Sequence, residues 1–246
     1  MIFLVMNMIW RVTNMKSFKL HKNFRKFLLN ENANSEGLCL YHSGDGKNYQ
    51  RIVIYKPASK EAIETSRLFL DTVIVGAISF ENTQTAISEP CIPETFHVNT
   101  IHTHKDYEGQ GFQKLLMDCA FYVLGKDDKG LTSDHREGTK DKAARAWNKI
   151  EKSSDYEKRK TKDGNDEFDY IEQTEDPDDD CDMPFKLPST HHSFKKKNLS
   201  DAKTQYEKLK SNHESIIKTL GRNKSAFENM LRNRSKEDFR VRYRGL

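Results

Sequence analysis

Paired cysteines are missing from this sequence of 246 residues. The four cysteines are Cys39, Cys91, Cys119 and Cys181, which lie far apart and form no Cys-x-x-Cys motif. This spacing does not favour a zinc site or a disulfide framework. A reducing compartment such as the cytoplasm fits this cysteine usage best.

Long apolar runs are missing as well. The N-terminus reads MIFLVMNMIW before Arg11, about ten residues, which is too short to cross a bilayer. It also lacks the basic leader and the cleavage site of a signal peptide. We interpret residues 1–14 as an apolar leader. It is either a buried strand, a stretch upstream of a later start at Met6, Met8 or Met15, or a segment that does not join the fold.

Hydrophobic residues make up only 35% of the chain and charged residues 32%, so part of the chain is not expected to join a core. The net charge of +4 is too small to argue for a nucleic-acid partner by itself. Residues 151–185 carry five basic and fourteen acidic residues, and residues 195–246 carry fifteen and six. These oppositely charged blocks either fold against each other or serve different partners.

Alternating patterns predict strands and helices in an α/β order between residues 15 and 175. The Asp-Gly turn between apolar runs predicts a hairpin over 37–56. Further along we expect a helix over 59–70 and a buried strand over 72–80 (TVIVGAISF). A strand from Phe96 to His104 leads into a helix that ends at Gly125 as its C′ residue. A strand over 131–134, a helix over 141–152 and one more strand at 168–171 complete the predicted domain.

The remainder is predicted to be a linker over 176–198, with Pro184 and Pro188, and a basic helical extension over 199–246. Residues 199–220 have apolar side chains at alternating spacings of three and four, a heptad seam that either pairs with a second chain or docks on the domain. A shorter helix over 225–233 and a capping box at Ser235 are expected to follow. The final residues, RVRYR, are expected to be a solvated tail rather than a nucleic-acid contact.

The stretch HTHKDYEGQGFQKLL, from His102 to Leu116, has the pattern expected of an anion-binding turn. A strand ends, Gly109 and Gly111 allow close approach of the backbone, and a helix begins. The first turn of a helix presents unpaired N–H groups and a partial positive charge, which suit a pyrophosphate. A tight strand-to-helix turn without a ligand is the equally frequent alternative.

His102 and His104 are two residues apart, which places them on one face of the predicted strand. Either histidine is a candidate general base near neutral pH, and two exposed polar side chains are the simpler interpretation. No third ligand at a suitable spacing supports a metal site. The run Ser133-Asp134-His135 lacks a nucleophile elbow and is better explained as a polar loop than as a catalytic triad.

The same stretch resembles the signature of the GNAT superfamily of acyl-CoA-dependent N-acyltransferases. There, a strand ends in an (Arg/Gln)-x-x-Gly-x-(Gly/Ala) loop and enters a leucine-rich helix. Gly109 and Gly111 match the loop, Leu115 and Leu116 match the helix, and TVIVGAISF is similar to the family's Val-Gly-containing central strand. The resemblance runs from about residue 70 to residue 152.

This resemblance implies a mixed, mostly antiparallel twisted sheet flanked by helices, with the α-helical extension added to it. It also implies acetyl-CoA or another acyl-CoA as cofactor and an amine as acceptor. The backbone amides of residues 109–113 would hold the pyrophosphate, and the strand near Thr103 would pair with the pantetheine arm. The amine would attack the thioester, and His102 or His104 would accept the proton. The implied cofactor-binding residues are Thr103, Glu108, Gly109, Gln110, Gly111, Phe112, Gln113 and Trp147.

The sequence departs from the family pattern at four positions. Glu108 stands where Arg or Gln is usual, Gln113 replaces a small residue, and Lys140 replaces Asn. Trp147 replaces the Tyr that usually protonates the thiolate, and an indole N–H is not a practical acid. The first hypothesis is therefore an active N-acyltransferase. The second is a catalytically inactive GNAT-like structural or assembly protein that acts through its helical extension.

The stretch from SDHREGT to KAARAW is similar to GNAT-like proteins of tailed-phage genomes, some of which are virion-associated. If the protein is phage-encoded, the resemblance implies a location in the host cytoplasm or in the virion. A homo- or hetero-oligomer formed through residues 199–220 belongs to the same hypothesis. No membrane partner is expected.

Overall fold

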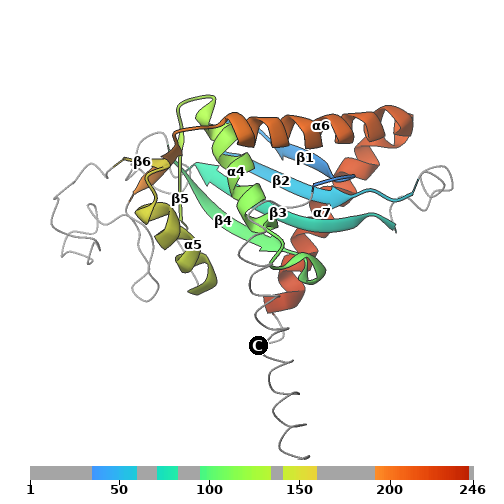
Figure 1. The fold of residues 1–246 in the computed structure, drawn as a ribbon. Coiled ribbons are helices and arrows are strands. Elements are labelled where there is room, and N and C mark those ends of the chain that lie inside the picture. Colours follow the sequence, from blue (N-terminus) through green and yellow to red (C-terminus); the bar gives the residue numbers. More distant parts are fainter. Residues whose placement is uncertain (1–34, 60–70, 83–94, 134–140, 160–191, 244–246) are drawn as a thin grey trace, which may run out of the picture.

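The computed structural model describes residues 35–59, 71–82, 95–133, 141–159 and 192–243. They form one seven-stranded sheet with helices packed against it (Figure 1). The strands are β1 (Cys39–Gly44), β2 (Tyr49–Lys56), β3 (Val73–Asn82), β4 (Thr95–Thr103), β5 (Gly130–Thr132), β6 (Tyr156–Arg159) and β7 (Ser193–Lys196). Their order is β1-β2-β3-β4-β5-β7-β6, and among these strands only β4 and β5 pair in parallel. The α/β class with a mixed, mostly antiparallel sheet is thereby confirmed.

The predicted hairpin is confirmed as β1 and β2, and its turn is held by one side chain. The Asp45 carboxylate accepts hydrogen bonds from the backbone N–H groups of Lys47, Asn48 and Tyr49, at 3.0, 2.7 and 3.0 Å. Gly46 adopts φ +72°, a left-handed conformation that an Asp-Gly turn requires.

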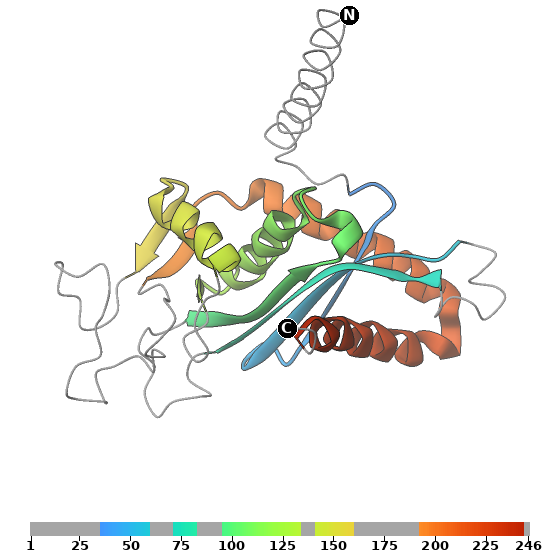
Figure 2. The ribbon, with the colours of Figure 1, turned by 90° about the horizontal axis from the view of Figure 1, so that it is seen from below.

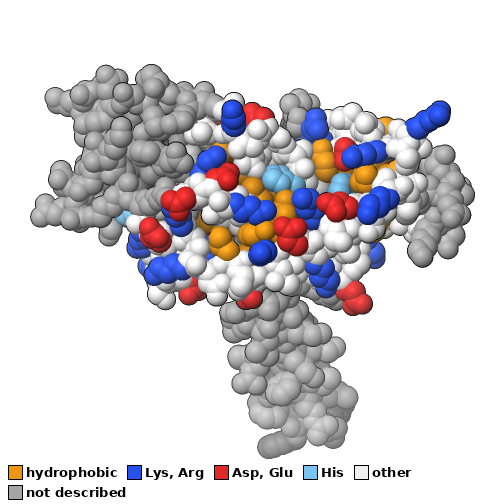
Figure 3. Space-filling model, turned by 90° about the horizontal axis from the view of Figure 1, so that it is seen from above, with side chains coloured by type: hydrophobic (Ala, Val, Ile, Leu, Met, Phe, Trp, Pro, Cys, Tyr) orange, Lys and Arg blue, Asp and Glu red, His pale blue; other side chains and the backbone are white. Residues whose placement is uncertain are grey.

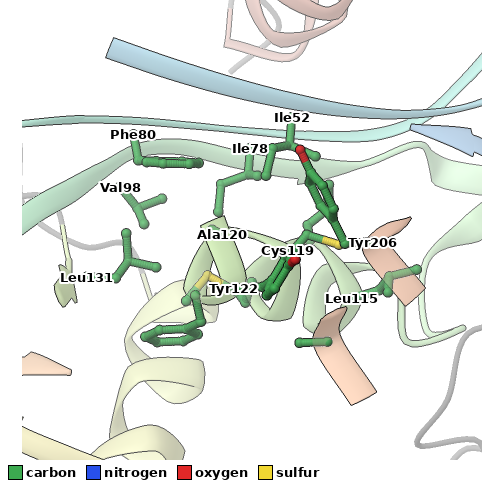
Figure 4. Packing of buried hydrophobic residues seen from close by; sticks show 14 of the residues in the cluster. Ile52, Ile78, Phe80, Val98, Leu115, Cys119, Ala120, Tyr122, Leu131 and Tyr206 are labelled. Carbon is green, nitrogen blue, oxygen red and sulfur yellow. The ribbon is translucent and has the colours of Figure 1, made fainter. Parts of the chain in front are cut away.

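The predicted central strand is confirmed as β3, which lies between β2 and β4 and is buried over most of its length. Its apolar composition follows from burial on both faces. On one face it packs against α4 (Phe112–Gly125), which supplies Leu116 to the larger core. Leu115 and Cys119 of α4 belong to the same core (Figure 4). The same face carries α5 (Asp141–Lys152), whose bounds are those predicted.

The other face of the sheet carries a smaller core. It is covered by α7 (Lys224–Tyr243) (Figure 2). Phe227 and Leu231 of α7 join residues of β1, β2 and β3 in this core. The ring of Phe227 meets the ring of Tyr55 edge-on at 5.7 Å. The sheet is therefore enclosed between α4 on one side and α7 on the other.

The heptad seam of α6 (Ser200–Leu220) is buried within this chain. Its Ala202, Tyr206 and Leu209 belong to the core beneath α4, and Leu220 belongs to the core beneath α7. Figure 1 shows α6 running beside β1, which is the outermost strand on that side. A helix placed there shields an edge strand from pairing with other chains.

Three predicted boundaries are wrong. The predicted linker contains a strand, because Ser193–Lys196 form β7 between β5 and β6. The predicted capping box does not start a new helix, because Ser235 lies inside the continuous α7 and its hydroxyl accepts a hydrogen bond from buried Arg51 at 3.1 Å. Gly125 is the last residue of α4 rather than its C′ residue, and a Cβ there would lie 2.6 Å from a methyl group of Leu199.

The leader, the helix over 59–70 beyond Ser59, and the strand at 168–171 lie outside the described residues. None of the described helices is long and apolar enough to cross a membrane.

Candidate functional site

The segment between β4 and α4 is a short, ordered turn. The 3-10 helix η2 (Lys105–Tyr107) follows β4, and residues 108–110 are exposed before α4 begins. Gly109 and Gly111 have φ values of +73° and +83°, which explains why glycine stands at both positions. The Gln110 side chain donates to the Asp106 carbonyl at 2.8 Å, so it supports the turn rather than capping the helix.

The N-terminus of α4 is open. Its N-cap residue is Gly111, and no side chain caps the helix there. The Phe112 side chain is buried and meets the ring of Tyr107 edge-on at 5.6 Å, which anchors the first turn. Because N–H groups of a first helical turn have no partner within the helix, this end of α4 presents a partial positive charge.

The parallel strands β4 and β5 pair over only three positions, at the end of β4 that lies away from this turn. Thr95, Phe96 and His97 align with Gly130, Leu131 and Thr132. Beyond His97, β4 continues to Thr103, whereas β5 ends at Thr132. The β5-facing edge of β4 is therefore not covered by β5 along its second half, which leads toward the open end of α4.

A bulge divides β4 into two halves. Ser79 of β3 aligns with Thr100 and Phe80 aligns with Val98, so Asn99 is the additional residue. The bulge reverses the alternation of side chains. As a result, Thr100 faces away from α4, and its hydroxyl lies 2.5 Å from that of Ser79.

Gly76 explains how closely the strands approach here. It aligns with Thr103, and a Cβ at Gly76 would lie 2.8 Å from the His102 carbonyl oxygen and 3.1 Å from Leu116 of α4. A glycine inside an apolar strand signals such a close approach. The Val-Gly pair in the sequence is thus accounted for by packing.

The two predicted histidines do not act as a pair on one strand. β4 ends at Thr103, and His104 instead caps η2, where its Nδ1 accepts a hydrogen bond from the Asp106 N–H at 3.3 Å. The His104 side chain is 38% exposed. His102 is half-buried and aligns with Ala77, which belongs to the core beneath α7.

The other predicted residues divide into two groups. Glu108 and Gln113 are exposed beside the open end of α4. Trp147 is only 5% exposed, and its ring stacks on Phe194 of β7 at 5.8 Å, so it presents little surface to a ligand. Lys140 lies outside the described residues.

One pair of titratable side chains was missed by sequence reasoning. His97 of β4 aligns with Glu81 of β3, and its Nε2 lies 3.2 Å from Glu81 Oε1. The side chains are 2% and 17% exposed, respectively. The signal in the sequence was a polar residue, His97, flanked by the apolar residues Phe96 and Val98.

His192, which sequence analysis placed in the linker, also has a partner. Its Nδ1 lies 3.0 Å from a carboxylate oxygen of Glu151 of α5, and its ring is near that of Phe194. Within the described ranges, no three His, Cys, Asp or Glu side chains gather as metal ligands. On the face above α6, basic and acidic side chains of the described residues are interspersed between small hydrophobic areas (Figure 3).

Comparison with models of protein families, with curated proteins and with solved structures finds no match to this chain.

Proposed function

We propose that this protein transfers an acyl group from acyl-CoA to an amine. The observation that supports this proposal is the uncapped N-terminus of α4 beside the edge of β4 that β5 leaves uncovered. An anionic pyrophosphate suits the first element, and an extended arm with amide groups suits the second. The two lie in succession along the chain, as an elongated cofactor requires.

In this proposal the backbone amides of residues 109–113 bind the pyrophosphate. The pantetheine arm lies along β4 beyond His97 and forms backbone hydrogen bonds as an added strand would. The glycine conformations at 109 and 111 allow the backbone to approach the phosphates without side-chain interference. The acyl group then reaches the sheet near the bulge at Asn99.

The chemistry is direct attack of the amine on the thioester carbon. His102, the proton acceptor predicted from the sequence, lies on the half of β4 that follows the bulge, between Asn99 and the turn. His104 is a weaker candidate, because its Nδ1 already accepts the Asp106 N–H that holds the turn.

A second function is a GNAT-like module without catalysis. Glu108 places a carboxylate beside the proposed pyrophosphate site, and buried Trp147 replaces the usual tyrosine acid. Assembly through the α6 seam is the less favoured form of this alternative, because Ala202, Tyr206 and Leu209 already pack on this chain's own core.

Thermal unfolding with acetyl-CoA tests the proposal. A ligand at 100-fold excess over its Kd stabilises the native state by about 2.7 kcal/mol, which raises the Tm by several degrees in a chain of this size. We expect such a rise with acetyl-CoA. No rise at millimolar acetyl-CoA, together with association that depends on protein concentration and is lost when residues 199–246 are deleted, would favour the module without catalysis.

A charge substitution locates the cofactor. Glu108→Gln removes the carboxylate at the open end of α4, whereas Asp127→Asn removes an exposed carboxylate just beyond its other end. Repulsion between exposed charges several ångströms apart is about 0.5–1 kcal/mol. Glu108→Gln should therefore tighten acetyl-CoA binding about two- to fivefold, with Asp127→Asn unchanged. Equal effects of the two substitutions would place the pyrophosphate elsewhere.

A further inference from the structure

An acid–base pair lies where β4 and β5 begin to separate. His97 is the last residue of β4 that aligns with β5, opposite Thr132, and on its other side it aligns with Glu81 of β3. His97 therefore lies on the strand position at which the uncovered edge of β4 begins, and its ring faces a carboxylate of β3. Both facing atoms, His97 Nε2 and Glu81 Oε1, are buried at 3.2 Å from each other.

The position matches the reactive end of an arm bound along β4. Strand residues rise about 3.3 Å each, so the six residues from Val98 to Thr103 extend about 20 Å from the turn at the open end of α4 back to His97. An arm that enters from that turn must therefore span most of this length to bring its reactive end near the point where the strands pair again. His97 lies at that point, whereas His102 lies close to where the arm enters.

We propose that His97 is the proton acceptor for the transfer and that Glu81 is its positioning residue, an inference that rests on the proposed function. The amine nitrogen forms a C–N bond with the acyl carbon, and the C–S bond breaks. The proton on nitrogen passes to the imidazole and then to the departing thiolate, so that an amine and a thioester give an amide and a thiol. The Glu81 carboxylate orients the ring and stabilises its protonated form.

The surroundings of the pair fit this role. Glu81 is the charged group that faces His97 from β3, and the hydroxyls of Ser79 and Thr100 pair with each other further along the same two strands. Thr132 of β5, which aligns with His97, donates its hydroxyl hydrogen to the His192 carbonyl. Burial of His97, whose side chain is 2% exposed, strengthens its interaction with the carboxylate. The proposal therefore requires that binding of the arm along β4 open the edge beside the imidazole to the amine.

The same position explains how the chain works without the tyrosine acid. With Trp147 stacked on Phe194, α5 supplies no phenol to protonate the thiolate. A single imidazole that receives the proton of the amine and returns it to sulfur needs no second acid. The acceptor in this step is a neutral amine, which gives one proton to the imidazole as the C–N bond forms.

The test compares His97→Gln and Glu81→Gln with wild type in thiol release from acetyl-CoA, using a panel of small primary amines and lysine-containing peptides. We expect kcat to fall about 100-fold for His97→Gln and about tenfold for Glu81→Gln, with the KM for acetyl-CoA unchanged. Added imidazole should restore part of the turnover of His97→Ala, an effect that a purely structural role would not produce. His42→Gln, which removes a histidine bonded to Tyr206 and Gln50 away from the site, is the matched control.

The outcomes separate the two proposals. If acetyl-CoA raises the Tm of wild type and His97→Gln keeps the wild-type kcat, the role of His97 is refuted while the acyltransferase proposal stands. Binding without thiol release from any amine also refutes the role of His97. If acetyl-CoA leaves the Tm of wild type unchanged, the proposed function itself fails.

Discussion

Acidification should destabilise this protein through His213 of α6. The imidazole is buried between the two strands of the hairpin and α7. Its Nδ1 lies 2.8 Å from the Tyr55 hydroxyl, its ring lies 5.5 Å from that of Tyr41, and its Nε2 lies 3.8 Å from Glu228. Burial lowers the pKa of His213 from its ordinary 6.5 to about 4, with Glu214 opposing this shift and Lys224 adding to it.

The sign of the effect follows from proton binding. Below pH 6.5 the unfolded chain binds a proton at His213, whereas the folded chain does not bind it until about pH 4. The contribution of His213 to the free energy of unfolding is therefore fully present above pH 6.5 and is lost as the pH falls from 6.5 to 4. One pKa unit corresponds to about 1.4 kcal/mol, so the loss is at most about 3 kcal/mol, and about 2 kcal/mol if the native structure relaxes around the charged ring.

Urea unfolding followed by circular dichroism measures this loss. We expect the free energy of unfolding of wild type to fall about 2 kcal/mol more than that of His213→Gln between about pH 7 and pH 4.5. The glutamine retains a polar partner for Tyr55, and the carboxylates that titrate in this range are common to both proteins. Parallel pH profiles for the two proteins would refute the attribution to His213.

Two substitutions test the packing of the C-terminal helices. Gly125→Ala brings a methyl group against Leu199 and should lower the free energy of unfolding by about 1–3 kcal/mol. In a double-mutant cycle, Leu199→Ala should recover much of this loss. Additive losses would show that the two residues are not in contact. Arg51→Met leaves the Tyr49 and Ser235 hydroxyls without their buried donor and should cost about 2–3 kcal/mol in urea unfolding. The exposed Arg145→Met should change stability by less than about 0.5 kcal/mol, and a similar loss for both arginine variants would contradict the anchoring role of Arg51.

Local patterns predicted most of the described elements correctly. The Asp-Gly turn, the apolar run of β3, the bounds of α5 and the glycine after α6 each depend on residues close in sequence. The errors occurred where contacts between segments far apart in the sequence decide the structure. Ser193–Lys196 looked like linker because a four-residue strand has too few residues to show alternation, and it exists only because β5 and β6 lie on either side of it.

The candidate site also combines local features that the sequence predicts with features that depend on the pairing of distant strands. The Gly109–Gly111 turn and the start of α4 were predictable, because glycine conformations and helix termini are local properties. The bulge at Asn99 was not, because it is a relation between β4 and β3 that changes which side chains share a face. His104 was wrongly placed on the strand with His102, because β4 ends at Thr103 and His104 caps η2 instead. The His97–Glu81 pair was overlooked, because it depends on the register between β3 and β4.

The sequence by itself determined where the turns, caps and apolar segments lie, because these depend on backbone conformations and side-chain periods within a few residues. Only the tertiary structure decided that β5 separates from β4 after His97, that Glu81 lies beside that histidine, and that α6 buries its seam on its own sheet. Each of these depends on the register between segments far apart in the chain. Register is set by the fit of whole faces against one another, which no single segment contains.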